Sequence, residues 1–159
     1  MKDLSIYFQP VETEGTFEEE QLGSIIERFQ DDNFPVLRDQ GTALLFCPEN
    51  RRGDHAKSND LFRQSLYSLY TGTKWEHKLY DLGTIKPGES IDDTIHAVAI
   101  SVSELIKNNI TPILVGGTQD LTIALYEAYS ELEQLVNLTS IDHQLDIGST
   151  ENEINQNGW

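Results

Sequence analysis

The sequence is poor in cysteine, in basic residues and in long apolar runs. One cysteine among 159 residues excludes an internal disulfide. The longest apolar stretches, residues 42–47 and 110–115, are far shorter than the roughly 20 residues that a membrane-spanning helix needs. The amino-terminal residues also lack the apolar segment and cleavage site of a secretory signal. We therefore expect a cytoplasmic, reduced protein that does not cross a membrane.

Positive charge is scarce and unevenly placed along the chain. Eleven Lys and Arg against 27 Asp and Glu give a formal net charge of −16, and no Lys or Arg follows Lys107. Such a surface repels nucleic-acid phosphates and anionic lipids, so neither is an expected partner. The carboxylates after Lys107 must be solvated, paired with distant cations or gathered around a bound cation.

The first 41 residues are expected to form an extension with one helix. Residues 2–11 fit a short edge strand. Thr16 and Glu19 have the spacing of a capping box at a helix start. Leu22, Ile25, Ile26 and Phe29 then repeat at helical spacing, and the pattern predicts a helix that ends at 31–35.

Strand and helix patterns alternate through the predicted core, residues 42–148. Short apolar runs predict strands at 42–47, 78–82, 111–115 and 136–141, and helical periods predict helices at 61–70, 91–106 and 121–132. In the first of these helices the expected buried stripe is Phe62, Leu66, Leu69 and Tyr70, and Ser90 is the expected cap of the second. This order predicts one α/β domain over residues 1–159, a three-layer α/β/α sandwich around a mainly parallel sheet. Residues 149–159 form a polar tail, and a sheet that stops after its fourth central strand is expected to be incomplete.

In parallel sheets ligands gather at the carboxyl ends of the strands. The segment 142–146 follows a predicted strand and holds Asp142, His143 and Asp146. Two carboxylates four residues apart with a histidine between them suit a divalent cation such as Mn²⁺ or Mg²⁺. A solvated acidic turn is the alternative interpretation.

Two further segments lie at strand ends. Gly116 and Gly117 form a glycine turn before a helix, and the backbone N–H groups of such a turn can bind a phosphate. The negative charge of Asp120 would repel that phosphate, so a turn that serves only close packing is the favoured interpretation. Cys47 ends a buried strand and is expected to pack rather than to act as a nucleophile. Arg51 or Arg52 is expected to meet an anionic substrate or to pair with nearby acids.

The order of these pieces resembles the amino-terminal half of the ureohydrolase superfamily, which includes arginase, agmatinase and formimidoylglutamase. The resemblance covers roughly residues 42–148 and is carried by Asp81-Leu-Gly83, a long helix, Pro112 to Gly117, a second helix, and Ile141-Asp142 with Asp146. It implies an arginase-like sandwich and a binuclear Mn²⁺ centre. The bridging hydroxide of that centre attacks a guanidinium or formimino carbon. It also implies an oligomer of identical subunits.

The resemblance assigns metal positions one by one. The family's G-G-D-H motif falls on Gly116 to Gln119, so Gln119 stands where a ligating histidine belongs. Its D-A-H-x-D motif falls on Asp142 to Asp146, so Asp142 and Asp146 are the implied metal ligands and Gln144 replaces a second histidine. His143 occupies the neighbouring position, whose side chain points the other way in an extended segment. An amide is a weaker ligand than an imidazole, so Mn²⁺ binding is expected to be weakened or absent. Gly116, Gly117, Asp120 and His143 are the expected neighbours of the site.

Three functions remain open at this stage. The first is a Mn²⁺-dependent hydrolase of guanidino or formimino C–N bonds, in which this chain is inactive alone and part of a longer parent. The second is a metal-free, non-catalytic relative that serves as a binding or assembly module. The third is an unrelated doubly wound binder of small molecules.

Overall fold

The computed structural model describes residues 3–13, 15–38, 40–51, 59–72, 74–133 and 135–141. In chain order the elements are the 3₁₀ helix η1 (Ser5–Tyr7), β1 (Phe8–Gln9), α1 (Leu22–Ile25), β2 (Glu27–Arg28), β3 (Gly41–Phe46), α2 (Asn59–Tyr67), β4 (Leu79–Ile85), α3 (Ile91–Lys107), β5 (Ile110–Val115), η2 (Gln119–Leu121) and α4 (Thr122–Glu131).

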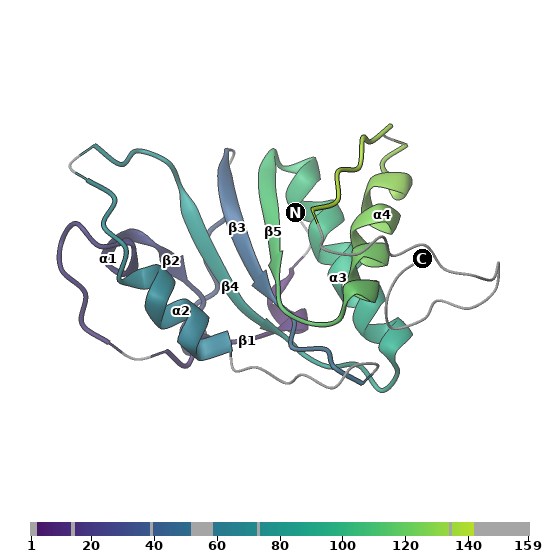
Figure 1. Cartoon of the computed structure of the whole chain (residues 1–159), viewed down its shortest axis with the longest axis horizontal. Helices are drawn as coiled ribbons and strands as arrows, with labels where there is room; N and C mark the ends of the chain where they lie inside the picture. Colours follow the sequence, from purple (N-terminus) through teal and green to yellow (C-terminus); the bar gives the residue numbers. More distant parts are fainter. Residues whose placement is uncertain are drawn as a thin grey trace.

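The sheet is mainly parallel, as the alternation of elements predicts. Its order is β1-β4-β3-β5, and β2 pairs with β4 beside β1. The pairs β3–β4, β3–β5 and β2–β4 are parallel, whereas β1 runs antiparallel to β4. Helices α1 and α2 lie on one side of the sheet, and α3 and α4 lie on the other (Figure 1). The three-layer α/β/α arrangement is therefore confirmed.

The central strand β3 is buried on both faces because each face has its own cluster of apolar side chains. Ala43 and Leu45 point into the cluster that α3 and α4 cover. Leu44 and Phe46 point into a smaller cluster that includes Tyr67 of α2. This alternation is that of an extended strand, and it explains why the sequence shows a continuous apolar run rather than a period of two.

The longest helix, α3, begins as its sequence predicts. The Ser90 hydroxyl accepts from the Asp93 backbone N–H at 3.1 Å, and the Asp93 carboxylate accepts from the Ser90 N–H at 2.8 Å. This capping box satisfies two backbone donors at the helix start. Among the helices of the described residues, none is long and apolar enough to cross a bilayer.

The predicted helix across residues 16–30 is wrong. Only α1 is helical there, its cap is Gln21, and the Thr16–Glu19 capping box does not form. Residues 27–28 form β2 instead, and the Phe29 N–H donates to the Asp81 carbonyl at 2.9 Å. Pairing with the open edge of β4 outweighs the local helical period, because it satisfies backbone groups of β4 that a helix at residues 27–29 would leave without a partner.

The predicted buried stripe of α2 is also wrong except at Leu66, which is half-buried against the smaller cluster. Phe62, Leu69 and Tyr70 are 47–61% exposed, whereas Arg63 and Tyr67 are 2% and 0% exposed. Arg63 and Tyr67 turn inward because Asp81 of β4 is fully buried beneath them. A buried carboxylate must be paired, so α2 turns the donors Arg63 and Tyr67 toward the sheet.

Three donors from α2 and one from the strand satisfy Asp81. The Arg63 Nε and Nη2 atoms lie 2.9 and 3.3 Å from its carboxylate oxygens, and the Tyr67 hydroxyl donates at 2.6 Å. The Gly83 N–H donates at 2.8 Å. Burial, together with the negative charge of Asp81, raises the pKa of Tyr67, which therefore remains a neutral donor. The motif Asp81-Leu-Gly83 thus anchors α2 to the sheet.

The predicted strand at 136–141 is absent, since the described residues 135–141 form neither helix nor strand. Their apolar side chains Leu135, Leu138 and Ile141 are 72–104% exposed. A strand needs a neighbour for its backbone groups, and this segment pairs with no strand of the described sheet.

Candidate functional site at the carboxyl edge of the sheet

The loops that follow β3 and β5 are joined by backbone hydrogen bonds. The Cys47 N–H donates to the Val115 carbonyl at 3.0 Å, and the Thr118 N–H donates to the Glu49 carbonyl at 3.0 Å. Both strands run parallel, so both loops emerge at the same edge. This is the edge at which the sequence predicts a ligand site.

The glycine turn after β5 has a steric reason. Gly116 and Gly117 have φ angles of +88° and +83°, which side chains rarely allow. A Cβ atom on Gly117 would lie 2.2 Å from the Leu121 Cδ1 atom and 2.8 Å from the Cys47 carbonyl oxygen. The turn therefore lets two loops and a helix pack closely, which requires glycine whether or not a ligand is bound.

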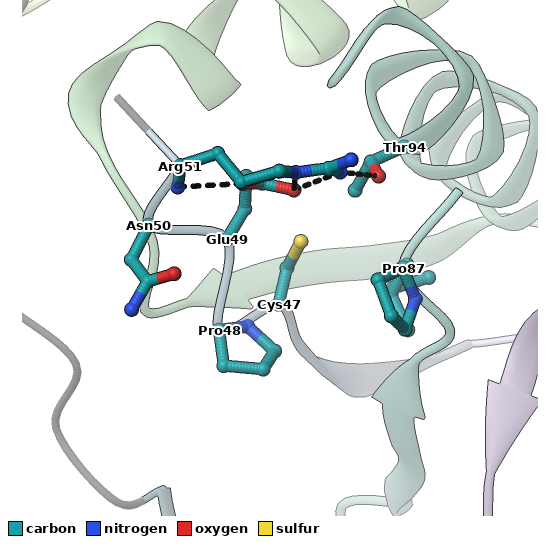
Figure 2. A pocket seen from close by; sticks show the side chains of 8 residues that line it. Cys47, Pro48, Glu49, Asn50, Arg51, Pro87 and Thr94 are labelled. Atoms are coloured by element: carbon teal, nitrogen blue, oxygen red, sulfur yellow. Dashed lines mark hydrogen bonds and ion pairs between the residues drawn. The ribbon is translucent and has the colours of Figure 1, made fainter. Parts of the chain in front are cut away.

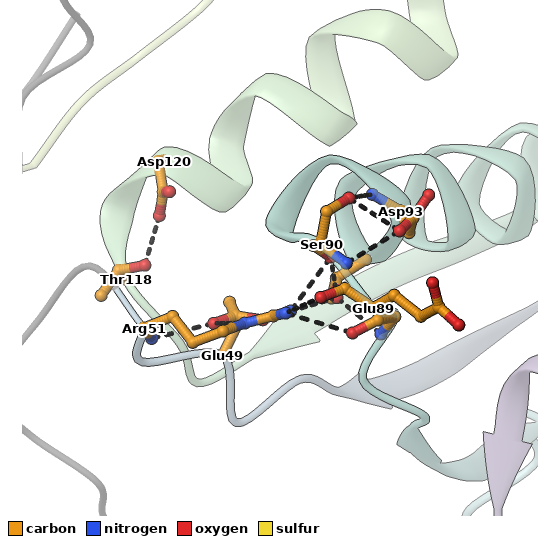
Figure 3. A network of polar contacts seen from close by, with 9 residues as sticks. Glu49, Arg51, Glu89, Ser90, Asp93, Thr118 and Asp120 are labelled. Atoms are coloured by element: carbon orange, nitrogen blue, oxygen red, sulfur yellow. Dashed lines mark hydrogen bonds and ion pairs between the residues drawn. The ribbon is translucent and has the colours of Figure 1, made fainter.

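The residues after this turn begin a short helix. Gln119 is exposed at the first position of η2, and Asp120 is half-buried behind it. The Thr118 hydroxyl donates to the Asp120 carboxylate (Figure 3). Asp120 is therefore hydrogen-bonded to its own loop, and its negative charge opposes an anion at this helix start.

The ion pair between Glu49 and Arg51, whose acidic partner the sequence did not identify, holds the loop after β3. Glu49 is 5% exposed and accepts from Arg51, whose backbone N–H donates at 2.9 Å and whose Nε donates at 2.9 and 3.0 Å. The Arg51 Nη1 and Nη2 atoms also donate to the carbonyls of residues 88–90 at 3.1–3.2 Å. Nη2 lies 2.8 Å from the Thr94 hydroxyl (Figure 2). The signal in the sequence is a Glu-x-Arg directly after a buried strand.

This pair changes the titration of both partners. Hydrogen bonds from Arg51 hold the pKa of Glu49 below its ordinary value, and the Glu49 carboxylate raises the pKa of Arg51. All three guanidinium nitrogens already donate to protein oxygens, so Arg51 links the β3 loop to the start of α3. The expected pairing with a nearby acid is observed, and it leaves an anionic substrate little to bind at this guanidinium.

A small cavity of about 290 Å³ opens beside the pair (Figure 2). It is lined by Cys47, Pro48, Glu49, Asn50, Arg51, Ile85, Pro87 and Thr94. Cys47 is 1% exposed, and burial raises the pKa of its thiol to about 11. A thiol that stays protonated at neutral pH is a poor nucleophile, so the cysteine packs as the sequence predicts.

The described part of this edge does not fit a Mn²⁺ centre. Gln119 offers an amide where the resemblance implies an imidazole, and Asp120 is hydrogen-bonded to Thr118. Within the residues that the structure describes, no group of three or more His, Cys, Asp or Glu side chains could hold a metal ion. The other implied positions, Asp142, His143, Gln144 and Asp146, lie outside the described residues.

The fold is that of an arginase-like α/β protein. Among the solved structures that share this fold are formimidoylglutamase from Bacillus subtilis and formiminoglutamase with Mn²⁺ from Trypanosoma cruzi. The first superposes with a TM-score of 0.71 at 19% sequence identity and covers 93% of this chain and 49% of that chain. The second superposes with a TM-score of 0.56 at 18% identity and covers 72% of this chain and 41% of that chain.

This similarity is one of structure and not of sequence. No protein-family model matches the chain, and no curated protein matches its sequence. The chain spans about half the length of the solved structures that it matches. The comparison therefore supports the arginase-like fold that the motifs imply.

Proposed function

We propose that this chain is an arginase-like half-domain that, by itself, neither binds Mn²⁺ tightly nor hydrolyses guanidino or formimino C–N bonds. It serves instead as a non-catalytic binding or assembly module. The observation that carries this proposal is the exposed Gln119 at the position that the resemblance gives to a ligating histidine. Its fold neighbours are enzymes that act on small formimino compounds, so a small molecule of that class is its expected ligand.

The chemistry of the edge supports the same proposal. A hydroxide generated between two metal ions requires strong ligands on both, and an amide oxygen is a weaker donor than an imidazole nitrogen. The nearby Arg51 is hydrogen-bonded to Glu49 and to backbone carbonyls. The described loops therefore contribute packing and hydrogen bonds to their own backbone rather than groups that activate water.

A second candidate is a Mn²⁺-dependent hydrolase that is completed by a further segment of a longer protein. The observation that favours it is the pair Asp142 and Asp146, which match the family's metal-binding aspartates by resemblance. The Trypanosoma cruzi neighbour is described with Mn²⁺, and both neighbours are about twice the length of this chain. In this candidate the chain is one half of the catalytic site.

Calorimetric titration of Mn²⁺ into the longest form of the protein separates these candidates, together with assays of formimidoylglutamate, arginine and agmatine hydrolysis. We expect no binding in the micromolar range and no turnover. Micromolar binding that disappears in a variant carrying Asp142→Asn and Asp146→Asn would overturn the first candidate. Turnover that disappears with it would establish the second.

A gain-of-binding experiment tests the placement of the two glutamines. The variant with Gln119→His and Gln144→His is expected to bind Mn²⁺ more tightly than the original chain, because it restores two imidazole ligands. A matched control places two histidines at exposed glutamines elsewhere, with Gln30→His and Gln64→His. Equal affinity in the two double variants would show that the implied ligand geometry is absent.

A further inference from the structure

An apolar surface lies at the amino edge of the sheet, opposite the candidate site. We define the amino-edge surface as Ile25, Leu69, Tyr70 and Trp75, which are 37–61% exposed. They come from the end of α1, from the residues after α2 and from the loop before β4 (Figure 1). The Leu22 N–H donates to the Leu69 carbonyl at 2.8 Å, which holds the first two segments side by side.

The surface includes a cavity with an aromatic wall. The cavity measures about 360 Å³ and is lined by Glu19, Glu20, Ile25, Thr71, Gly72 and Trp75. The Trp75 Nε1–H donates to the His77 carbonyl at 2.6 Å, which fixes the position of the indole although the residue is 43% exposed. A fixed, half-exposed indole beside a cavity is typical of a binding anchor.

The rim of the surface is acidic. Glu18, Glu19, Glu20 and Glu76 are exposed around it. The same loop carries two exposed cations, Lys74 and Lys78, and Lys78 pairs with Glu27 at 3.3 Å. Glu18 accepts from the Tyr70 hydroxyl. Within the described part of the chain, the side chains of Glu19 and Glu20 take part in no hydrogen bond or ion pair. Two unpaired carboxylates beside an indole suit a Lys or Arg side chain, which gains from both the charges and the ring.

We propose that the amino-edge surface docks a cationic segment of a partner protein, in which apolar residues alternate with Lys or Arg. Charge selects this occupant, because a second copy of the chain would bring a net charge of −16 against −16. Apolar side chains of the segment cover Leu69 and Tyr70, and a basic side chain enters the cavity between Trp75 and the two glutamates. This surface is independent of the metal question at the carboxyl edge.

A fluorescence titration tests the proposal. The chain carries Trp159→Phe, so that Trp75 is the remaining tryptophan, and the probe is a synthetic peptide of Lys-Leu-Leu-Lys repeats. We expect binding that shifts the Trp75 emission and weakens by about tenfold with Glu19→Gln plus Glu20→Gln. The matched control is Glu127→Gln plus Glu131→Gln on α4, two exposed glutamates with the same change in charge. That control is expected to change the affinity by less than about twofold.

Several outcomes would overturn the proposal. Equal weakening in the two double variants would mean attraction to net charge alone. Binding of butylguanidine as tight as that of the peptide would mean a site for a small organic cation. A dimer in sedimentation equilibrium that Trp75→Ala dissociates would mean that a second copy covers the surface.

Discussion

Replacing Asp81 by Asn tests whether the buried ion pair holds α2 on the sheet. Asp81 is 0% exposed and Arg63 is 2% exposed, and the Arg63 Nε atom lies 2.9 Å from the carboxylate. Asparagine keeps the size of the side chain but turns one acceptor oxygen into a donor. That donor would face the groups that now donate to Asp81, and the buried Arg63 guanidinium would lose the negative charge of that carboxylate.

The expected loss of stability is large. Removing one partner of a buried ion pair costs about 3–5 kcal/mol, since the remaining charge stays desolvated. For a domain of about this size, each kcal/mol lowers the Tm by about 2–4 °C, so Asp81→Asn should lower it by about 6–20 °C. The Arg63 guanidinium keeps its contacts with the Phe46 ring at 3.7 Å and with the Thr84 hydroxyl at 3.3 Å, which favours the lower half of this range.

Urea unfolding followed by circular dichroism measures this loss, and a double variant controls for the change in volume. Asp81→Leu with Arg63→Met replaces both charges by apolar groups and should cost much less than the sum of the two single changes, because no unpaired charge is left. A loss below about 1 kcal/mol for Asp81→Asn, or additive single and double effects, would refute the role assigned to the pair.

The other predictions concern the carboxyl edge. Gly117→Ala should lower the free energy of unfolding by about 2–4 kcal/mol, because Gly117 has a positive φ and its Cβ would contact neighbouring atoms closely. The control Gly72→Ala has a positive φ but open space around its Cβ, so it should cost about 1–2 kcal/mol in the same urea assay. Equal losses would contradict the packing role of the turn at Gly117. Cys47 should react with a thiol reagent only at the rate of unfolding, and rapid labelling of the native chain would show that the thiol is accessible. Because the pKa of Glu49 is lowered in the fold, its pairing with Arg51 stabilises the protein above the ordinary glutamate pKa and is lost as pH falls below it. Glu49→Gln should therefore reduce the loss of stability on acidification, and an unchanged acid-unfolding curve would argue against the pair.

The elements that could be predicted from the sequence depend on local signals. Strand β3 is a continuous apolar run, and α3 combines an apolar stripe with the capping box at Ser90 and Asp93. Strand β5 ends at the glycine turn that its sequence shows. Each of these signals lies within one element, so neighbours elsewhere in the chain do not alter it.

The parts that could not be predicted depend on partners far away in sequence. Residues 27–28 read as helix, but they extend along β4 because an edge of that strand is open to them. Residues 136–141 read as strand, but no described strand pairs with them. Backbone pairing across long separations decides both cases, and a window of neighbouring residues contains no information about it.

Helix α2 shows the same dependence for side chains. Its apolar residues form a stripe at helical spacing, yet Arg63 and Tyr67 are the buried ones because Asp81 requires donors. The sequence shows Asp81 in a strand without showing that both faces of that strand are covered. The stripe that was expected in the core is consequently half-exposed, and its end, Leu69 and Tyr70, supplies part of the amino-edge surface.

The two residues at the centre of the metal question are constrained to different degrees. Gly117 is required by its φ angle and by the closeness of the β3 loop, so the glycine turn would persist without any metal. Gln119 is exposed at the start of η2, where a substitution usually changes the free energy of unfolding by less than about 0.5 kcal/mol. The packing of this edge therefore accounts for the glycines but does not select glutamine over histidine. It follows that Gln119→His should leave the urea midpoint nearly unchanged, and a large fall in that midpoint would show that glutamine is itself part of the packing.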